Sequence, residues 1–293
     1  MTKETRGLLL GFIGVAGFSL TPPATRAAVL HLDPLFVTYG RAVLAGVIAA
    51  LILGLSNQRW PPRHTLLSLA VVAACIVIIF PLLLALALRT VPAAHTGVML
   101  GILPLMTVIV ATLRCKESPS PLFWCVAVLG GGVVMGYALM YGEGAIQAAD
   151  GLLVIAVVIA AVGYAEGARL GKSLGSWQTV CWALVVGAPI LLLPLIIMFY
   201  NSPIVAPTSA WVGFFYVALV SQLFAFFPWY HGMAIAGTAK VSQIMLLMPL
   251  MTIVFSSTLL LETVDGITWL FAGVIVMIVA LSWRLPVRRT DAP

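Results

Sequence analysis

The sequence predicts an all-α membrane protein with ten transmembrane helices, arranged as two inverted five-helix repeats. Three observations lead to this fold class. Of the 293 residues, 62% are hydrophobic and only 8% are Asp, Glu, Lys or Arg, whereas roughly 25% of the residues in a soluble domain are charged. The chain is also a succession of long apolar runs, and motifs of its first half recur in its second half. The composition excludes a soluble enzyme, a nucleic-acid-binding domain and a disordered chain.

Ten apolar runs, separated by proline, glycine and charged residues, are each long enough to span a bilayer, which takes about 20 apolar residues. The alternation typical of a β-barrel is absent. The first run lacks an A-x-A cleavage site, so we expect a span there rather than a signal peptide. The expected helices are Gly7–Val29, Leu35–Leu55, Leu66–Leu88, Ala93–Leu113, Leu122–Tyr141, Gly151–Leu170, Val180–Tyr200, Trp211–His231, Val241–Leu261 and Ile267–Trp283.

The basic residues predict the orientation. If the ten helices alternate in direction, twelve of the fifteen Lys and Arg residues fall on the side of the membrane that holds both termini. Lys and Arg are enriched in the cytoplasmic loops of membrane proteins. We therefore expect a multi-pass protein of a bacterial-type inner membrane, with its N and C termini in the cytoplasm.

An internal repeat relates the two halves of the chain. The sequence Pro-Leu-Met-Thr at positions 104–107 recurs at 249–252, and the same offset of 145 residues aligns Glu117 with Glu262. Five helices per repeat is an odd number, so the second repeat must enter the membrane upside down. Inverted repeats are typical of secondary transporters, although a duplicated scaffold that does not transport is an alternative. The expected repeats are residues 1–144 and 145–293.

These half-repeats resemble the EamA-type branch of the drug/metabolite transporter superfamily. The resemblance rests on the two Pro-Leu-Met-Thr helices, each followed by a glutamate, and on the small-residue-rich helix that closes each half. Within the branch, Phe18-Ser19, the run Leu84–Leu88, and Phe224-Ala225 with Trp229 resemble YddG-type amino-acid exporters. This implies export of aromatic and other neutral amino acids through a central cavity lined by the first, third, fourth, sixth, eighth and ninth helices.

The chain departs from these relatives at three cavity positions. Gly101, Ala161 and Met245 stand where relatives look aromatic or polar. The resemblance therefore implies a roomier pocket that is less specific for aromatic rings.

Prolines inside the expected helices point to the same region. A proline removes one backbone hydrogen bond and collides with the carbonyl four residues earlier, and lipid cannot satisfy a freed carbonyl. Pro22, Pro104 and Pro249 are therefore expected at hinges or cavity walls. For a single proline, a kink that serves packing is an equal alternative.

An amino-acid substrate needs polar partners for its ammonium and carboxylate groups, and an apolar wall for its side chain. Methionine suits a wall that accepts several shapes, although Met and aromatic residues at helical spacing are more often simple packing. The polar candidates are Ser19, Thr21, Tyr164, Ser242 and Gln243. The apolar candidates are Phe18, Phe80, Met99, Trp229, Met245 and Met248.

Charges within membrane spans are costly and are functional candidates by default. Arg41 either meets a carboxylate or a freed carbonyl, or extends back to the interface. Glu166 either forms a surface pair with Arg169 or couples protons. His95 and Lys240 occupy equivalent repeat positions, where we expect an interface role, with gating as the alternative.

No cofactor, metal site or catalytic constellation is expected. The four cysteines form no C-x-x-C pair, and Gly167–Ser173 has three residues between its glycines where a P-loop has four. Glu117 and Glu262 are both expected to anchor helix ends, and the pairs Gly7/Gly11 and Gly132/Gly136 are expected to let helices approach closely.

The sequence thus predicts a secondary transporter that exports amino acids by alternating access and performs no covalent chemistry. Its expected partners are a small-molecule substrate and membrane lipids but no nucleic acid, and it is expected to work as a monomer. An exporter of drugs or other small metabolites, and a non-transporting membrane scaffold, are the alternatives.

Overall fold

The structure is a computed structural model that describes residues 2–114, 117–141, 147–201, 205–283, 285 and 287–289. Within these ranges, nine helical segments are long and apolar enough to cross a membrane. The tenth expected span is α15 (Gly266–Trp283), in which the apolar stretch Gly266–Ile278 is shorter. The predicted all-helical membrane fold is confirmed.

The first half of the bundle forms five spans. The first span consists of α1 (Lys3–Ser19) and α2 (Thr21–Val29), and the second is α3 (Pro34–Leu55). The third consists of η1 (Arg63–Thr65), α4 (Leu66–Val72), the π-helical η2 (Ala73–Ile79) and α5 (Phe80–Leu88). The fourth consists of α6 (Ala93–Leu100) and α7 (Leu103–Arg114), and the fifth is α8 (Pro121–Tyr141).

The second half contains the remaining spans. The sixth span is α9 (Ala148–Leu174), and the seventh is α10 (Ser176–Asn201). The eighth consists of α11 (Thr208–Tyr216), the π-helical η3 (Val217–Phe224) and α12 (Phe226–Ala236). The ninth consists of α13 (Thr238–Ser242), the 3₁₀ segment η4 (Gln243–Leu246) and α14 (Leu247–Leu259), and the tenth is α15. The strands β1 (Glu117–Pro119) and β2 (Val287–Arg289), which the sequence did not predict, pair antiparallel.

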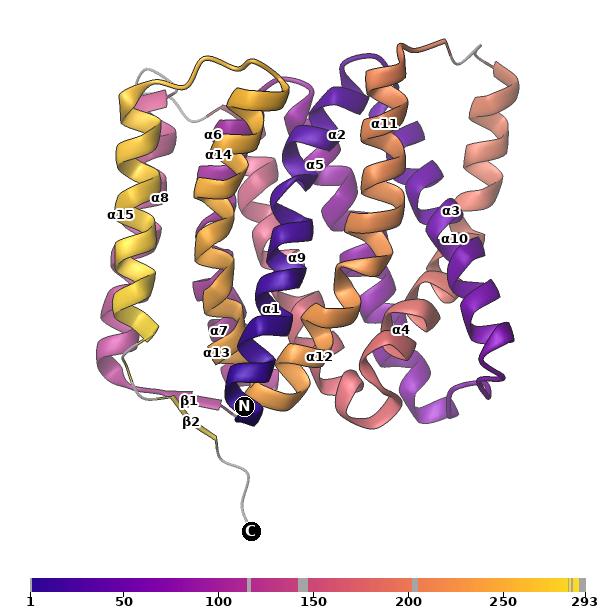
Figure 1. The fold of residues 1–293 in the computed structure, drawn as a ribbon, viewed down its shortest axis with the longest axis horizontal. Coiled ribbons are helices and arrows are strands. Elements are labelled where there is room, and N and C mark those ends of the chain that lie inside the picture. Colours follow the sequence, from indigo (N-terminus) through magenta and orange to yellow (C-terminus); the bar gives the residue numbers. More distant parts are fainter. Residues whose placement is uncertain are drawn as a thin grey trace.

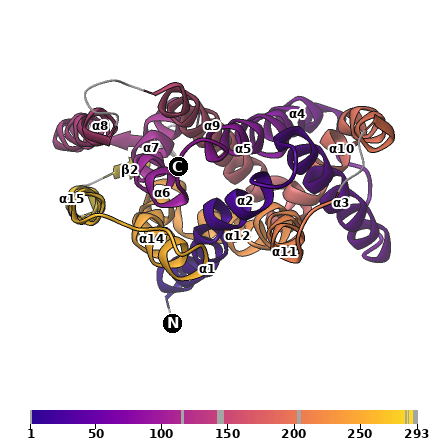
Figure 2. The ribbon, with the colours of Figure 1, turned by 90° about the horizontal axis from the view of Figure 1, so that it is seen from above.

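The two halves are interleaved. Helix α1 packs along α12, and α9 packs along α4 and α5, so the first span of each half contacts the third span of the other. The pairs α3 with α10, α6 with α14 and α8 with α15 also join equivalent spans of the two halves. Seen from above, α8 and α15 lie at one end of the long axis, and α3 and α10 at the other (Figure 2).

Both termini lie at one end of the bundle, which we call the terminal end, while the loops before α6 and after α14 lie at the distal end (Figure 1). Helix α1 starts at the terminal end. Helix α9 starts at the distal end, because Asp150 in its first turn contacts His95 in the first turn of α6.

Close approach of α1 and α12 depends on glycine. A Cβ on Gly7 would collide with Ala236, and a Cβ on Gly14 would collide with Trp229. Gly11 is equally crowded, so the prediction for Gly7 and Gly11 is confirmed. The prediction for Gly132 is wrong, because no heavy atom lies within 4 Å of the position its Cβ would take.

Four spans lose regular α-helical geometry midway, at equivalent positions of the two halves. The π-helical segments η2 and η3 begin 144 residues apart, and the break after Leu100 corresponds to η4. Pro81 and Pro228 lie after the π-helical segments, and Pro104 and Pro249 lie after the other two irregular stretches. Each of these prolines removes a helical hydrogen bond, and this loss disturbs the helix just before it. Such mid-helix irregularities are frequent at functional sites and hinges.

Large apolar side chains cover the outer surface of the bundle. Ile13, Leu51, Leu193 and Leu270 are each more than half exposed. Soluble monomers rarely expose contiguous apolar surface on this scale. The surface is that of a multi-pass membrane protein with its outside facing lipid.

Candidate substrate cavity

A small cavity lies in the middle of the bundle, where the irregular parts of the helices meet. It is lined from η2 by Ile76, from η3 by Ser221 and Gln222, and from the ends flanking two helix breaks by Thr21 and Leu100. Its volume is about 20 Å³, which is room for about one water molecule. The walls are therefore close together in this structure.

One side of the cavity is polar. The hydroxyls of Thr21 and Ser221 are 2.7 Å apart and share a hydrogen bond. Arg41, which is 2% exposed, donates from Nη2 to Ser221 Oγ at 3.3 Å. Gln222 donates from Nε2 to the carbonyl oxygen of Ile76 at 3.3 Å and so links η3 to η2. The polar side thus joins elements of both halves.

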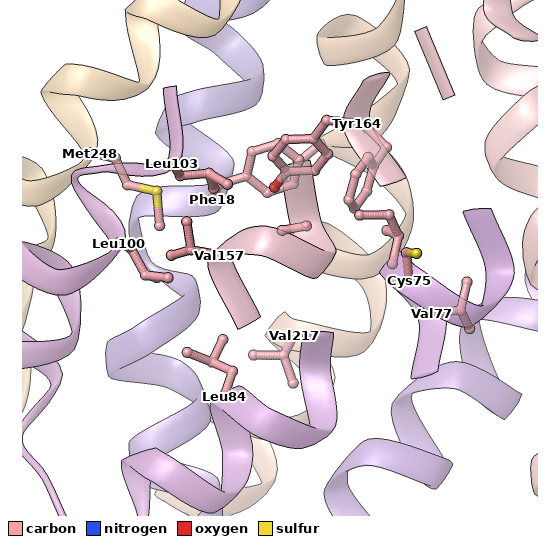
Figure 3. Packing of buried hydrophobic residues seen from close by; sticks show 14 of the residues in the cluster. Phe18, Cys75, Val77, Leu84, Leu100, Leu103, Val157, Tyr164, Val217 and Met248 are labelled. Carbon is pink, nitrogen blue, oxygen red and sulfur yellow. The ribbon is translucent and has the colours of Figure 1, made fainter. Parts of the chain in front are cut away.

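The other side is apolar and rich in rings. The Phe18 ring lies 4.8 Å from Phe226 and 6.4 Å from Tyr164, centroid to centroid. Figure 3 shows Phe18 close to Tyr164, with Leu103 and Met248 beyond it. Phe80, Leu84 and Leu100 complete this wall. A ligand here would meet aromatic and flexible apolar surface next to a cation and two hydroxyls.

The structure brings several predicted site residues together at this cavity. The members of the sequence-derived set that line it are Phe18, Thr21, Arg41, Phe80, Tyr164 and Met248. Arg41 does not extend back to the membrane interface as one alternative had it, because its side chain is buried in the bundle.

Other predicted residues lie outside the cavity lining. Trp229 packs behind it, 6.0 Å from the Phe18 ring, and Ser19 donates to the Val15 carbonyl at 2.8 Å. Met99 lines a separate apolar groove between α6, α7, α8 and α9. The remaining residues of this group are buried elsewhere in the bundle and are Gly101, Ala161, Ser242 and Met245. The side chain of Gln243 lies outside the part of the chain that the structure describes.

The predicted hinge prolines stand at breaks in the helices. Pro22 is in the first turn of α2, directly after the break that follows α1. Pro104 is the second residue of α7, and Pro249 is the third residue of α14, after η4. Whether they act as hinges stays a prediction.

The lining residues that the sequence analysis missed are the apolar Ile76, Leu84, Leu100 and Leu103, and a group just before Pro228, namely Ser221, Gln222 and Phe226. The available signal was Pro228, which frees the carbonyl of Phe224 and indicates an irregular helix just before it. The π-helical turn that brings both Ser221 and Gln222 to the cavity leaves no signature in an apolar run.

At the distal end, Glu262 ties three elements together. Its carboxylate accepts from the backbone N–H groups of Ala93 and Ala94, at 3.0 and 3.1 Å, at the start of α6. It also pairs with Arg26 Nε at 2.9 Å. A carboxylate is favourable at a helix N-terminus, and the predicted anchoring role of Glu262 is confirmed.

Equivalent polar pairs join the two halves at opposite ends. At the distal end, His95 Nε2 lies 2.7 Å from Asp150 Oδ1, and both side chains are at most 2% exposed. At the terminal end, Lys240 Nζ lies 2.9 Å from Glu4 Oε1, and both side chains are more than half exposed. His95 and Lys240 are 145 residues apart, and Glu4 and Asp150 are 146 apart.

Glu166 differs from the expected surface pair. It contacts Arg169, but the Glu166 side chain is only 3% exposed while that of Arg169 is 51% exposed. Arg169 also donates to Ser68 Oγ at 2.6 Å, so the pair links α9 to α4 near the terminal end.

The apolar outer surface, the interleaved halves and the polar-lined cavity between them define a multi-pass membrane transporter. Comparison with known proteins agrees. The model of the EamA-like transporter family matches residues 5–141 and 147–284. The chain belongs to this family, and each half of the bundle corresponds to one match.

Individual relatives support the assignment. The uncharacterized transporter YdeK of Bacillus subtilis (strain 168) is 42% identical over 288 residues, which cover 97% of this chain and 99% of that protein. Protein PecM of Dickeya dadantii (strain 3937) is 24% identical over 260 residues, 83% of this chain and 82% of that protein. A crystal structure matches 95% of this chain and 96% of its own at 17% identity, with a TM-score of 0.68, and shows the shared fold. The nearness to YddG-type exporters stays a prediction.

Proposed function

We propose that this protein is an inner-membrane secondary transporter that exports amino acids by alternating access. The observation that carries the proposal is the cavity between the two halves, whose lining combines the polar Arg41, Thr21 and Ser221 with the apolar Phe18 and Met248. An amino acid has the same two-sided character, with charged groups at one end and a side chain at the other.

Two similar halves in opposite orientation provide one route to alternating access, and the packing supports such an arrangement. Helices α1 and α9 begin at opposite ends of the bundle, and each contacts the third span of the other half. We propose that residues 1–144 and 145–293 are inverted repeats. Exchange of their conformations would then open the cavity to one side and the other in turn.

We propose that the His95–Asp150 and Glu4–Lys240 pairs close the two ends of the bundle in turn. Each joins the start of the first span of one half to the start of the fourth span of the other. In an inverted repeat, parting one pair and keeping the other opens the bundle at one end only. The irregular stretches beside the cavity, with Pro104 and Pro249, would absorb the bending.

The orientation follows from charge. Basic residues gather at the terminal end, and cytoplasmic loops are enriched in Lys and Arg. We therefore propose that the terminal end faces the cytoplasm and that substrate enters there for export. The protomer is proposed to work as a monomer, since each half supplies part of one cavity.

Counterflow in proteoliposomes tests the proposal. Vesicles loaded with an unlabelled amino acid should accumulate the labelled form in a protein-dependent manner, across a panel of amino acids and at two pH values. Protein-dependent uptake of other metabolites or drugs, but of no amino acid, would replace the substrate class. Absence of flux for every compound would favour the scaffold alternative.

A matched pair of substitutions tests the location of the pathway. Met248 lines the cavity whereas Met245 does not, and both side chains are buried. Met248→Trp should therefore reduce flux more strongly than Met245→Trp, when each is normalised to folded protein by size-exclusion chromatography. Equal flux in the two variants would remove the cavity from the pathway.

A further inference from the structure

Arg41 is a buried cation that faces the cavity with unused hydrogen-bond donors. It lies on α3 and is 2% exposed. Its Nη2 donates to Ser221 Oγ at 3.3 Å, while Nε and Nη1 have no hydrogen-bond partner among the residues that the structure describes. Within the described residues, no carboxylate pairs with it.

A buried guanidinium in this situation calls for an anionic ligand. The group stays protonated at physiological pH, and its planar fork of N–H donors matches a carboxylate. A buried charge without a counter-ion is strongly unfavourable. Charge-assisted hydrogen bonds from Arg to a carboxylate are among the strongest in proteins.

The cavity offers much less to an ammonium group. None of the residues given for its lining is acidic, so an ammonium would meet aromatic rings and the neutral oxygens of Thr21, Tyr164, Ser221 and Gln222, but no counter-charge. The lining therefore carries one positive charge in a site of low dielectric, where charge preferences are strong. The opposite wall, with Phe18, Phe226 and Met248, accepts an apolar body of variable shape.

We propose that Arg41 binds the carboxylate of the substrate, and that the substrate class is a small carboxylate with an apolar body in which the amino group is dispensable. This rests on the proposed function and narrows it. Amino acids qualify through their carboxylate, and 2-oxo acids of the same side chain qualify equally. Amines without a carboxylate are excluded.

The same contact couples binding to the two halves. Arg41 belongs to the first half, and its partner Ser221 lies on the π-helical segment η3 of the second half. A carboxylate that takes up the free donors of Arg41 changes the contact between them. The cavity, which has room for only about one water molecule, must widen to admit the ligand.

Three compounds with the same ring show whether binding requires the carboxylate or the amino group. They are phenylalanine, phenylpyruvate, which lacks the amino group, and phenethylamine, which lacks the carboxylate. A ligand of the folded state raises the melting temperature, so the full-length protein in detergent is heated with each compound. We expect a rise with phenylalanine and phenylpyruvate and none with phenethylamine. In counterflow, the two carboxylates should compete with labelled phenylalanine and the amine should not.

Variants of Arg41 complete the test. Arg41→Gln should abolish the rise in melting temperature and lower carboxylate uptake at least about tenfold, because the charge-assisted bonds are lost. Arg41→Lys keeps a positive charge but not the fork, so it should retain part of the uptake. The control is Arg89→Gln, which removes an exposed cation and should leave both measurements unchanged.

The outcomes are separable from those of the proposed function. Equal stabilisation by phenethylamine, or full carboxylate binding by folded Arg41→Gln protein, would overturn the inference even if amino acids are transported. Binding of phenylpyruvate without flux of any compound would uphold the inference while the transport proposal fails. Folding of each variant is confirmed by its size-exclusion profile and by a cooperative melting transition.

Discussion

At the residue scale, one carboxylate does the structural work of a helix cap and a counter-ion together. Glu262 accepts from Ala93, Ala94 and Arg26, and its side chain is 13% exposed. Partial burial makes such bonds stronger than those of a solvated surface pair. The start of α6 therefore depends on a residue that lies 169 positions further along the chain.

Glu262→Gln should lower the stability of the protein by about 1–2 kcal/mol, because the amide keeps one acceptor oxygen but loses the charge. Glu4→Gln, the control at the exposed pair, should change it by less than about 1 kcal/mol. Thermal unfolding in detergent measures both. Equal shifts for the two variants would show that Glu262 contributes no more than a surface charge.

Trp229 was expected in the cavity lining, but the structure places it behind the lining. It is fully buried beside Phe18 but does not line the cavity, and its indole N–H meets no hydrogen-bond acceptor within the described part of the chain. Trp229→Phe should therefore alter stability by about 1–2 kcal/mol without changing the ratio of uptake between substrates. Competition counterflow with two amino acids of different size checks this. A changed ratio would place Trp229 in the substrate pathway.

How far residues could be predicted depended on the kind of signal. Phe18, Tyr164 and Arg41 stand out as rings and a charge in membrane spans, and the structure brings them to one cavity. Ser221 and Gln222 sit in an apolar run with nothing to mark their depth. Ser19 does not line the cavity, because its hydroxyl donates to the carbonyl oxygen of Val15 in its own helix. Any serine in a membrane span can form such a local hydrogen bond instead of one to a ligand.

At the element scale, helix contact is set by which glycines face a neighbour. A Cβ at Gly14 would meet Trp229 and the carbonyl oxygen of Ala225, whereas Gly132 has open space beside it. Gly14→Ala should therefore cost about 1–3 kcal/mol through overpacking. Gly132→Ala should be neutral or stabilise α8 by up to about 1 kcal/mol. Thermal unfolding of the two variants would contradict this if Gly132→Ala were the more damaging change.

The ends of the spans were predictable because charge, Pro and Gly mark them, and the expected helices coincide with the observed ones to within a few residues. The breaks near Pro22 and Pro104 were predictable for the same reason. The π-helical segments η2 and η3 were not, since both are apolar runs in which a change from α to π geometry alters no pattern.

At the scale of the whole molecule, the duplication places an equivalent pair between the halves at each end of the bundle, and Arg26 with Glu262 forms a second inter-half pair at the distal end. The repeat itself was readable from the recurrence of Pro-Leu-Met-Thr. The pairing of His95 with Asp150 was not, because it joins the first turn of a fourth span to that of a sixth, and only the folded arrangement shows which ends meet.

Cross-linking tests whether both ends must part during transport. In a background without Cys75, Cys115, Cys125 and Cys181, a cysteine pair replaces either His95 and Asp150 or Glu4 and Lys240. A short bifunctional thiol reagent should stop counterflow in each double variant. Single-cysteine variants treated with the same reagent are the controls. Flux that persists after complete cross-linking at either end is incompatible with alternating access.

The two pairs stand at equivalent positions of the two halves but differ in their exposure to solvent. The distal pair is shielded, so ions in the medium hardly screen it, while the terminal pair is exposed and weakens as ionic strength rises. If the halves exchange conformations as proposed, the carrier without substrate spends more time open to the cytoplasm than open to the outside. The carrier would then bind substrate more often from the cytoplasm, because the two equivalent pairs differ in strength. Raising the ionic strength would increase this preference by weakening the exposed pair.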